Sequence, residues 1–340
     1  MKKILKLLVI LSSAIVLIIL MFFTNGIEEL AGMISSIKPQ WILAAFGCMI
    51  FYWILDALIL FMISGSMLER LRIRDYIRFT MIGQFFNAIT PMSGAGQPVQ
   101  AYVMVKDGIK PGHAASIIII KSLLHQLIIV IYATVAFFIK GSLFAGKIGD
   151  LFYLFILGLV INSTFLVFYF LFIFNKDVAR KVLFWILKLL SRFKFARKLE
   201  EKSKKIETEI DSFNEGAANL SKNVLLMLLL VLAQILQFTF YFSIPYFIQL
   251  SMENFRIHIV DMISAQSLIT LISLLVPLPG GTGGIEGLSY LFYGLFFRAG
   301  YIIPAILLYR IITYYASIIF GGLFAMYAPE KPLKQQQTEN

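Results

Sequence analysis

Several stretches of this chain are apolar for longer than the roughly 18 residues that a helix needs to cross a bilayer, for example residues 151–174. Hydrophobic residues make up 59% of the 340-residue chain, whereas water-soluble domains contain roughly 45–50%. No stretch alternates apolar and polar residues as a half-buried strand does. The sequence therefore predicts an all-α polytopic membrane protein, with residues 1–340 forming a single transmembrane domain.

The positive charges of the chain are unevenly distributed. The net charge is +11, and Lys and Arg concentrate in particular segments between the apolar runs. Because cytoplasmic loops of membrane proteins are enriched in Lys and Arg, these segments and both termini are predicted to be cytoplasmic. Because the membrane orientation already explains the basic segments, no nucleic-acid partner is predicted. The single cysteine, Cys48, lies in an apolar run and is expected to pack rather than react.

About six full spans are predicted from the apolar runs. Their approximate bounds are 7–23, 41–63, 113–138, 151–174, 223–248 and 302–327. The segment 139–150 is predicted to be a short outside loop. A basic cytoplasmic loop is predicted after the second span, with Arg70, Arg72, Arg74 and Arg78.

Proline and glycine interrupt two shorter apolar segments, which follow the second and fifth spans. A helix does not continue through such a break, because proline lacks a backbone donor and glycine has the highest backbone entropy. Within a membrane, broken backbone is tolerated only where protein buries it or where it lines a wet cavity. Both segments are therefore predicted to be re-entrant hairpins, the first with a short entering arm over residues 80–90. The loop residues are Pro91, Gly94, Gly96, Pro279, Gly280, Gly281, Gly283 and Gly284.

The two hairpins resemble each other in their spacing. The distance along the chain from Gly96 to Lys121 nearly equals that from Gly284 to Arg310. The predicted topology gives the hairpins opposite orientations, which favours an inverted repeat of the kind found in secondary transporters. A chance match between two loops rich in glycine and proline is the alternative. The repeats cover approximately residues 41–174 and 223–327.

The only extended polar region, residues 175–221, is predicted to be cytoplasmic. Its first part, residues 176–198, combines many Lys and Arg residues with apolar residues at helical spacing. This pattern predicts an amphipathic helix that lies on the inner leaflet and is attracted by anionic lipid.

Two cations lie inside predicted spans. Lys121 and Arg310 are each about eight residues from the start of a span, roughly 12 Å deep. A charge near the bilayer centre costs on the order of 2.5–3.5 kcal/mol, so a substrate-lining role is favoured over snorkelling to the interface. His125 follows Lys121 on the same helix face, and Tyr314 follows Arg310.

Two carboxylates are candidate partners for these cations. Glu286 directly follows the second glycine break, where it can cap a helix or form an ion pair with Arg310 that a substrate opens. Asp56 lies in the middle of a span, and a structural ion pair is favoured over a proton relay. Amide side chains complete the predicted headgroup path: Gln84, Asn87, Gln97 and Gln237.

The sequence contains no recognisable catalytic constellation. The three histidines, His113, His125 and His258, do not have a metal-ligand spacing with cysteine or carboxylate residues. The glycine-rich segment lacks the Lys-Ser/Thr ending of a phosphate-binding loop. No catalytic residue, metal or cofactor is therefore predicted.

Two motifs resemble a known family. Residues 89–100, Ile-Thr-Pro-Met-Ser-Gly-Ala-Gly-Gln-Pro-Val-Gln, and residues 278–286, Leu-Pro-Gly-Gly-Thr-Gly-Gly-Ile-Glu, with the later Arg310, are similar to the lysylphosphatidylglycerol synthase transmembrane family. This family includes the flippase part of the bacterial multiple peptide resistance factor. Many members have Gly-Glu and a later Arg in the first half, whereas this chain has Gly96-Gln97 and Lys121.

The resemblance implies that the chain moves a phospholipid, aminoacylated phosphatidylglycerol in the best-known members, across a bacterial plasma membrane. Lys121 and Arg310 would be two pseudo-symmetric stations for its headgroup. A lipid-modifying enzyme of the phosphatidylglycerol lysyltransferase type and a transporter of small polar solutes remain alternatives. Whether the chain forms a homo-oligomer or works with a separate synthase is also open.

Overall fold

The structure, a computed structural model, describes residues 37–67, 71–90, 94–148, 151–175, 178, 180–181, 220, 222–252, 257–273, 281 and 283–326. The predicted first span at 7–23 and nearly all of the predicted amphipathic helix at 176–198 lie outside these residues. So do the loop residues Pro91, Pro279 and Gly280.

All regular secondary structure in the described ranges is helical, as predicted. The helices are α3 (Pro39–Ser66), α4 (Ile73–Ile89), α5 (Gly96–Lys106), α6 (Pro111–Ile148), α7 (Leu151–Phe174), α11 (Val224–Met252), α12 (Ile259–Ser273), α13 (Gly284–Tyr293), α14 (Ala299–Arg310), the π-helix η1 (Ile311–Tyr315) and α15 (Ala316–Met326). Among the residues just given, five helical stretches are long and apolar enough to cross a membrane: Pro39–Ser66, Pro111–Gly141, Tyr153–Ile173, Val224–Met252 and Ala299–Met326.

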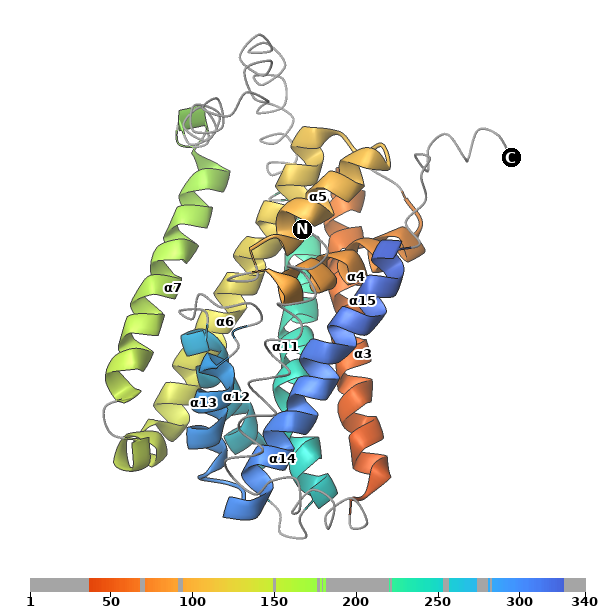
Figure 1. The fold of residues 1–340 in the computed structure, drawn as a ribbon. Helices are drawn as coiled ribbons and strands as arrows, with labels where there is room; N and C mark the ends of the chain where they lie inside the picture. Colours follow the sequence, from red (N-terminus) through yellow and green to blue (C-terminus); the bar gives the residue numbers. More distant parts are fainter. Residues whose placement is uncertain are drawn as a thin grey trace, which may run out of the picture.

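The long helices run alongside one another, and the short helices lie toward opposite ends of the bundle (Figure 1). In this view α4 and α5 occupy the upper half, whereas α12 and α13 occupy the lower half. The count of six spans and the re-entrant path of the hairpins stay predictions, because residues 7–23 and parts of both hairpin loops are not among the described residues.

The antiparallel helices α3 and α11 pack along each other, with α11 near the middle of the bundle in the view of Figure 1. At one end the backbone N–H of Lys38 donates to the carbonyl of Ser251, with an N–O distance of 2.9 Å. Midway along the pair, the rings of Tyr52 and Tyr241 lie 5.0 Å apart between centroids. This pairing brings the two predicted halves of the chain into direct contact.

Each short helix pair also packs against a long helix of the other half. Helix α4 packs on α15, and α12 packs on α6. The approach of α4 and α15 is close at Gly321, where an added Cβ would collide with the backbone oxygen of Met81. Contacts between the two halves therefore include both short helix pairs as well as α3 and α11.

Helix α4 differs from its predicted form in both length and burial. It begins at Ile73 rather than near residue 80, because the Asp75 carboxylate accepts the backbone N–H of Arg72 at 3.0 Å and so caps the helix. Arg78, which was predicted to lie in a basic loop, is instead buried within α4. Its guanidinium forms an ion pair with Asp107 at the end of α5.

The predicted outside loop after residue 138 is also wrong at its start, because α6 continues to Ile148. Lys140 on this extension forms an ion pair with Asp261 of α12, with an N–O distance of 2.7 Å. Helix α7, which follows, has the predicted bounds.

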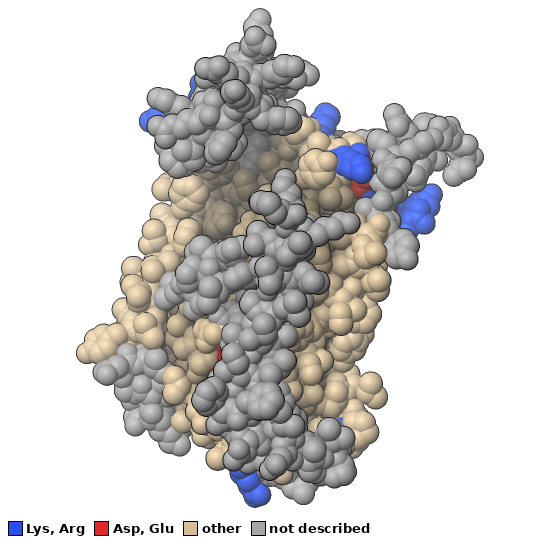
Figure 2. All heavy atoms as spheres, in the orientation of Figure 1, with Lys and Arg blue, Asp and Glu red and all other residues tan. Residues whose placement is uncertain are grey.

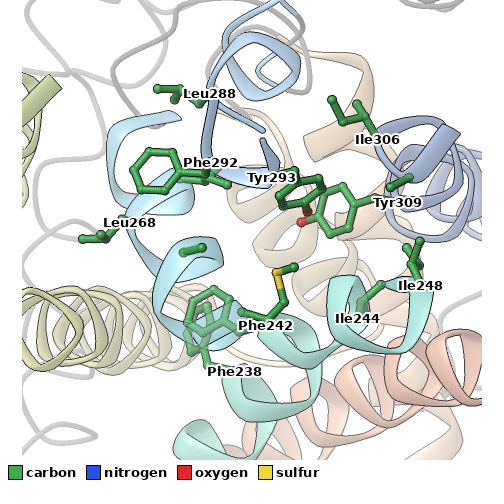
Figure 3. Close-up of a cluster of buried hydrophobic side chains, with 14 of the residues drawn as sticks. Phe238, Phe242, Ile244, Ile248, Leu268, Leu288, Phe292, Tyr293, Ile306 and Tyr309 are labelled. Atoms are coloured by element: carbon green, nitrogen blue, oxygen red, sulfur yellow. The ribbon is translucent and has the colours of Figure 1, made fainter. Parts of the chain in front are cut away.

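Aromatic and aliphatic side chains fill the space between α11, α12, α13 and α14 (Figure 3). Phe238 and Phe242 project from α11 toward Leu268 of α12 and Phe292 of α13. On the face shown in Figure 2, the described Lys and Arg residues gather near the two ends of the bundle. Many large hydrophobic side chains on the long helices are exposed, for example Phe51, Phe165 and Leu228. Such a surface suits contact with lipid chains.

Candidate functional site

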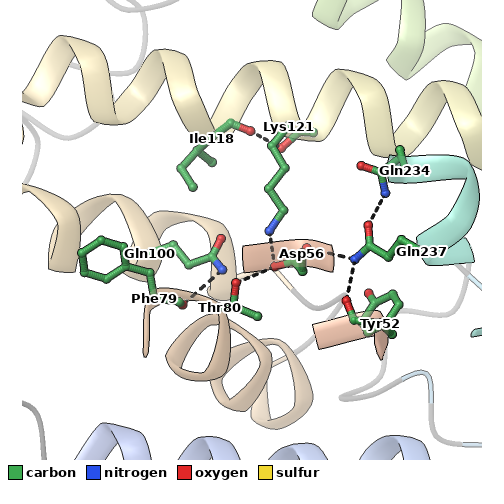
Figure 4. Close-up of polar contacts among 10 residues, drawn as sticks. Tyr52, Asp56, Phe79, Thr80, Gln100, Ile118, Lys121, Gln234 and Gln237 are labelled. Atoms are coloured by element: carbon green, nitrogen blue, oxygen red, sulfur yellow. Dashed lines mark hydrogen bonds and ion pairs between the residues drawn. The ribbon is translucent and has the colours of Figure 1, made fainter. Parts of the chain in front are cut away.

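The first buried ion pair joins α3 to α6. Nζ of Lys121 lies 2.6 Å from Oδ2 of Asp56, and both side chains are almost fully buried (Figure 4). The hydroxyl of Thr80 on α4 donates to the same carboxylate oxygen at 2.9 Å. Nε2 of Gln237 on α11 donates to Oδ1 at 3.1 Å. The Asp56 carboxylate therefore connects four helices through three donors.

An amide pair extends this cluster along α11. Nε2 of Gln234 donates to Oε1 of Gln237 at 2.5 Å, and Nε2 of Gln237 also donates to the backbone oxygen of Tyr52 at 3.3 Å. The amides thus orient the donor that Gln237 offers to Asp56. A buried carboxylate with several donors keeps its charge at a tolerable cost, but removing one charged partner is expected to be expensive.

The second buried ion pair lies within the second half of the chain. Oε1 of Glu286 on α13 accepts the Nε–H of Arg310 on α14 at 2.8 Å, and Nη2 of Arg310 lies 2.7 Å from the same oxygen. Oε2 of Glu286 accepts the backbone N–H of Gly283 at 2.7 Å. Glu286 therefore both caps its own helix and pairs with Arg310, so the two roles weighed from the sequence occur together.

Tyr314 lies beside the second ion pair. The guanidinium carbon of Arg310 is 5.3 Å from the centroid of the Tyr314 ring, which is a cation–π contact. The Tyr314 hydroxyl is buried and has no hydrogen-bond partner among the described residues. The π-helix η1 begins directly after Arg310, and π-helical turns frequently occur at functional sites.

A chain of hydrogen bonds links α11, α12, α13 and α14. The Tyr293 hydroxyl donates to Oε1 of Gln266 at 2.8 Å, and Nε2 of Gln266 donates to the Tyr309 hydroxyl at 2.9 Å. The Tyr309 hydroxyl in turn donates to that of Tyr241 at 2.9 Å. Tyr241 lies one helical turn beyond Gln237, and Tyr309 directly precedes Arg310. Together with the two buried ion pairs, these side chains form the polar interior of the bundle.

The remaining amide and histidine residues of the predicted headgroup path differ in burial and in what they contact. The His125 ring packs against Phe238, with 4.8 Å between the ring centroids. Gln84 and Asn87 are half-buried on α4, and Asn87 lies where a Cβ on Gly96 would collide with its side chain. Gln97 is exposed on α5.

The described glycines of the second hairpin explain its shape. Gly281 and Gly283 have φ values of +64° and +84°, in the left-handed region that disfavours residues with a side chain. These two residues turn the chain immediately before α13 begins at Gly284. The turn places Glu286 in the first helical turn, where its carboxylate reaches the backbone N–H of Gly283.

Sequence reasoning missed several polar residues. Gln266, Tyr293 and Tyr309 stand in apolar segments where single polar residues usually serve packing, and no spacing rule links them. The Arg78–Asp107 pair had a signal, since Asp107 is an acid in an otherwise basic region. Burial raises the pKa of Asp107, and the Arg78 guanidinium acts in the opposite direction.

Within the described ranges, no group of three or more His, Cys, Asp or Glu residues is arranged to hold a metal ion. The polar groups instead form paired charges and hydrogen-bonded amides and hydroxyls. These groups offer buried charges of both signs.

Long apolar helices that enclose buried ion pairs define a multi-pass helical membrane protein. Residues 4–321 match the family described as the Lysylphosphatidylglycerol synthase TM region, and the chain belongs to this family. It is also similar to a UPF0104 membrane protein of Archaeoglobus fulgidus, with 26% identity over 307 residues that cover 88% of this chain and 92% of the relative.

Proposed function

We propose that this protein moves a phospholipid between the two leaflets of a membrane. The headgroup would pass through the polar interior of the bundle while the acyl chains stay in the bilayer. The observation that carries this proposal is the Glu286–Arg310 ion pair, a buried and charge-balanced site within an apolar bundle of a lipid-related membrane family. A phosphate that leaves water needs fixed donors and positive charge to offset its desolvation.

The charge balance of the site favours a particular headgroup chemistry. A purely anionic headgroup that binds Arg310 leaves Glu286 buried without a counter-charge. A headgroup that carries a phosphate and an ammonium group can satisfy both members of the opened pair. Aminoacylated phosphatidylglycerol meets this condition, which agrees with the substrate of the best-known family members.

The order of the helices supports a mechanism with two moving halves. A long helix, a short pair and another long helix occur in α3–α6 and again in α11–α15. We propose that these halves form an inverted repeat whose rocking exposes the polar interior to each leaflet in turn. Arg72, Arg74, Lys106, Lys110 and Lys222 flank the helix ends that we place on the cytoplasmic side of a bacterial plasma membrane.

The proposal is tested in proteoliposomes that contain the full chain and acyl-labelled fluorescent lipids. Phosphatidylglycerol and lysylphosphatidylglycerol are compared, and the outer-leaflet label is bleached with an impermeant reductant. We expect the wild type to accelerate bleaching of the labelled lipids that start in the inner leaflet, because these must cross the bilayer to reach the reductant. Arg310→Gln should slow translocation by about tenfold or more, because a charge-assisted contact contributes roughly 1.5–3 kcal/mol.

Lipid translocation by Arg310→Lys should be slowed less, since the positive charge remains while the planar guanidinium group is lost. Tyr290→Phe is the matched control, because Tyr290 is half exposed on the same helix as Glu286. If the wild type moves neither lipid faster than empty vesicles, lipid translocation is rejected. Uptake of a small zwitterionic solute by the same vesicles would then support the solute-transporter alternative.

A further inference from the structure

A single shift in residue number relates the two halves of the chain. The shift that carries Lys121 onto Arg310 also carries Phe51 and Tyr52 onto Phe240 and Tyr241. These counterparts meet in space: the Phe51 and Phe240 rings stack at 5.0 Å, and the Tyr52 and Tyr241 rings are also 5.0 Å apart. Residues that face each other across α3 and α11 are thus equivalent under the repeat.

The same shift shows that the two cations have non-equivalent partners. It carries Gln97 onto Glu286, so the first hairpin has an amide where the second has a carboxylate. Gln97 is exposed, and Lys121 takes its carboxylate partner from Asp56 on α3. The counterpart of Asp56 under the shift is Pro245, which carries no charge. The two halves therefore match in the positions of their cations, but not in the positions of the carboxylates that pair with them.

The two carboxylates also differ in what holds them. Asp56 accepts Lys121, Thr80 and Gln237, which come from three helices other than its own. Separating Lys121 from Asp56 would therefore disturb the junction of α3, α4, α6 and α11. A hydrogen-bonded charge network of this kind resists the removal of any single partner.

Glu286 has a different set of contacts. Within the part of the chain that the structure describes, its second oxygen bonds only to the backbone N–H of Gly283, at the start of its own helix. A movement of α13 away from α14 would therefore break the contact with Arg310 and keep the Gly283 contact intact. The positive φ values of Gly281 and Gly283 identify a turn at which such a movement can take place.

The first hairpin is fastened by contacts that the ion pair at Lys121 does not share. Arg78 on α4 pairs with Asp107 after α5, and Nε2 of Gln100 on α5 donates to the backbone oxygen of Phe79 at 3.2 Å. These contacts hold α5 to α4. Among the described residues, the contacts that hold α5 to α4 therefore do not involve Lys121.

We propose that the two ion pairs have unequal roles: Arg310 exchanges its carboxylate for the phosphate of the headgroup, whereas Lys121–Asp56 stays closed as a fixed joint. This inference rests on the proposed lipid function and replaces two equivalent stations with one. The buried Tyr314 hydroxyl beside Arg310, which has no partner among the described residues, would donate to the same phosphate. Asp56 is thus a positioning residue, and Glu286 is the group that the ligand displaces.

The test measures binding of a short-chain lipid to the purified full chain in an uncharged sugar detergent. Dihexanoyl-phosphatidylglycerol and its lysyl ester are the probes, and dihexanoylglycerol, which lacks phosphate, is the control. Glu286→Gln should tighten binding of dihexanoyl-phosphatidylglycerol by about tenfold or more, because it removes the group that competes for Arg310. Arg310→Gln should weaken binding of both phosphate probes by about tenfold or more.

Variants at the Lys121–Asp56 pair should change stability rather than lipid binding. Thr80→Val removes one donor to Asp56 and leaves all charges in place, so binding should stay within about twofold while the melting temperature falls. Asp56→Asn should lower the melting temperature further without tightening the binding of either probe, in contrast to Glu286→Gln. The melting temperature shows that each variant is folded before its binding is interpreted.

The outcomes separate this inference from the proposed function. If Asp56→Asn tightens phosphate binding as much as Glu286→Gln, the two stations are equivalent and the assignment is wrong, while lipid binding stands. If the wild type binds neither phosphate probe better than dihexanoylglycerol, the proposed function and this inference both fail. Tight binding only for Glu286→Gln, lost again in the double variant Glu286→Gln/Arg310→Gln, supports the assignment.

Discussion

Gly321 of α15 lies against the backbone oxygen of Met81 of α4, at the contact between the two halves of the chain. A methyl group at Gly321 would meet backbone atoms, which cannot rotate away. The adjacent Gly322 is different, because a Cβ added there would lie 3.4 Å from its nearest neighbour, a ring carbon of Phe85. The fold therefore requires glycine at one of these positions and tolerates a side chain at the other.

We predict that Gly321→Ala lowers the stability of the protein by about 1–3 kcal/mol, because overpacking forces the helices apart. Gly322→Ala is the matched control and should change stability by less than about 0.5 kcal/mol. Melting temperatures of the two variants in the same detergent provide the measurement. Equal melting temperatures would show that α4 and α15 do not pack this closely.

Asp56→Asn is expected to destabilise the protein by about 3–5 kcal/mol, since it leaves the buried Lys121 cation without its carboxylate. Asp261→Asn is the control, because the Lys140–Asp261 pair is partly exposed, with side-chain exposures of 29% and 14%. Such pairs contribute about 0–1 kcal/mol. A similar loss in both variants, measured by thermal unfolding, would contradict the central role of Asp56.

Tyr293→Phe should cost about 1–3 kcal/mol, because the buried Oε1 of Gln266 then loses its donor. Tyr290→Phe changes the same atom on the same helix at a half-exposed position, and it should be nearly neutral. The difference in melting temperature between the two variants tests the hydrogen-bonded chain. If Tyr293→Phe is also neutral, that chain does not contribute to stability.

The predicted orientation can be tested with single cysteines in a Cys48→Ser background. Lys222→Cys should react with an impermeant thiol reagent only after the cytoplasmic face is opened, and Arg298→Cys should react in intact cells. Both positions are exposed at opposite ends of the bundle. Labelling of Lys222→Cys in intact cells would reverse the proposed orientation.

Much of the helical framework could be predicted from the sequence. The apolar run at 151–174 has the bounds of α7, since a helix that must satisfy its backbone within hydrocarbon extends through the whole run. Helix α4 shows the limit of this reasoning. The start of α4 depends on the cap that Asp75 provides. Arg78 can be buried because it pairs with Asp107, which comes close to it only when the chain has folded.

The candidate site likewise contains contacts that could be predicted from the sequence and contacts that could not. The proximity of Glu286 to Arg310 could be expected, because the chain reverses direction after the short return arm and so brings the two residues close together in space. The three donors of Asp56 and the chain from Tyr293 to Tyr241 could not, since they join residues from helices that are distant in sequence. No local pattern encodes such contacts.

The sequence alone determined that this chain is a helical membrane protein with two glycine-rich breaks and cations within its spans. These properties follow from local chemistry: the length of the apolar runs, the backbone preferences of glycine and proline, and the cost of a charge in hydrocarbon. Only the tertiary structure decided that Lys121 is held by Asp56 and Arg310 by Glu286. The partner of a buried charge depends on which helices pack together, and that packing is set by the chain as a whole.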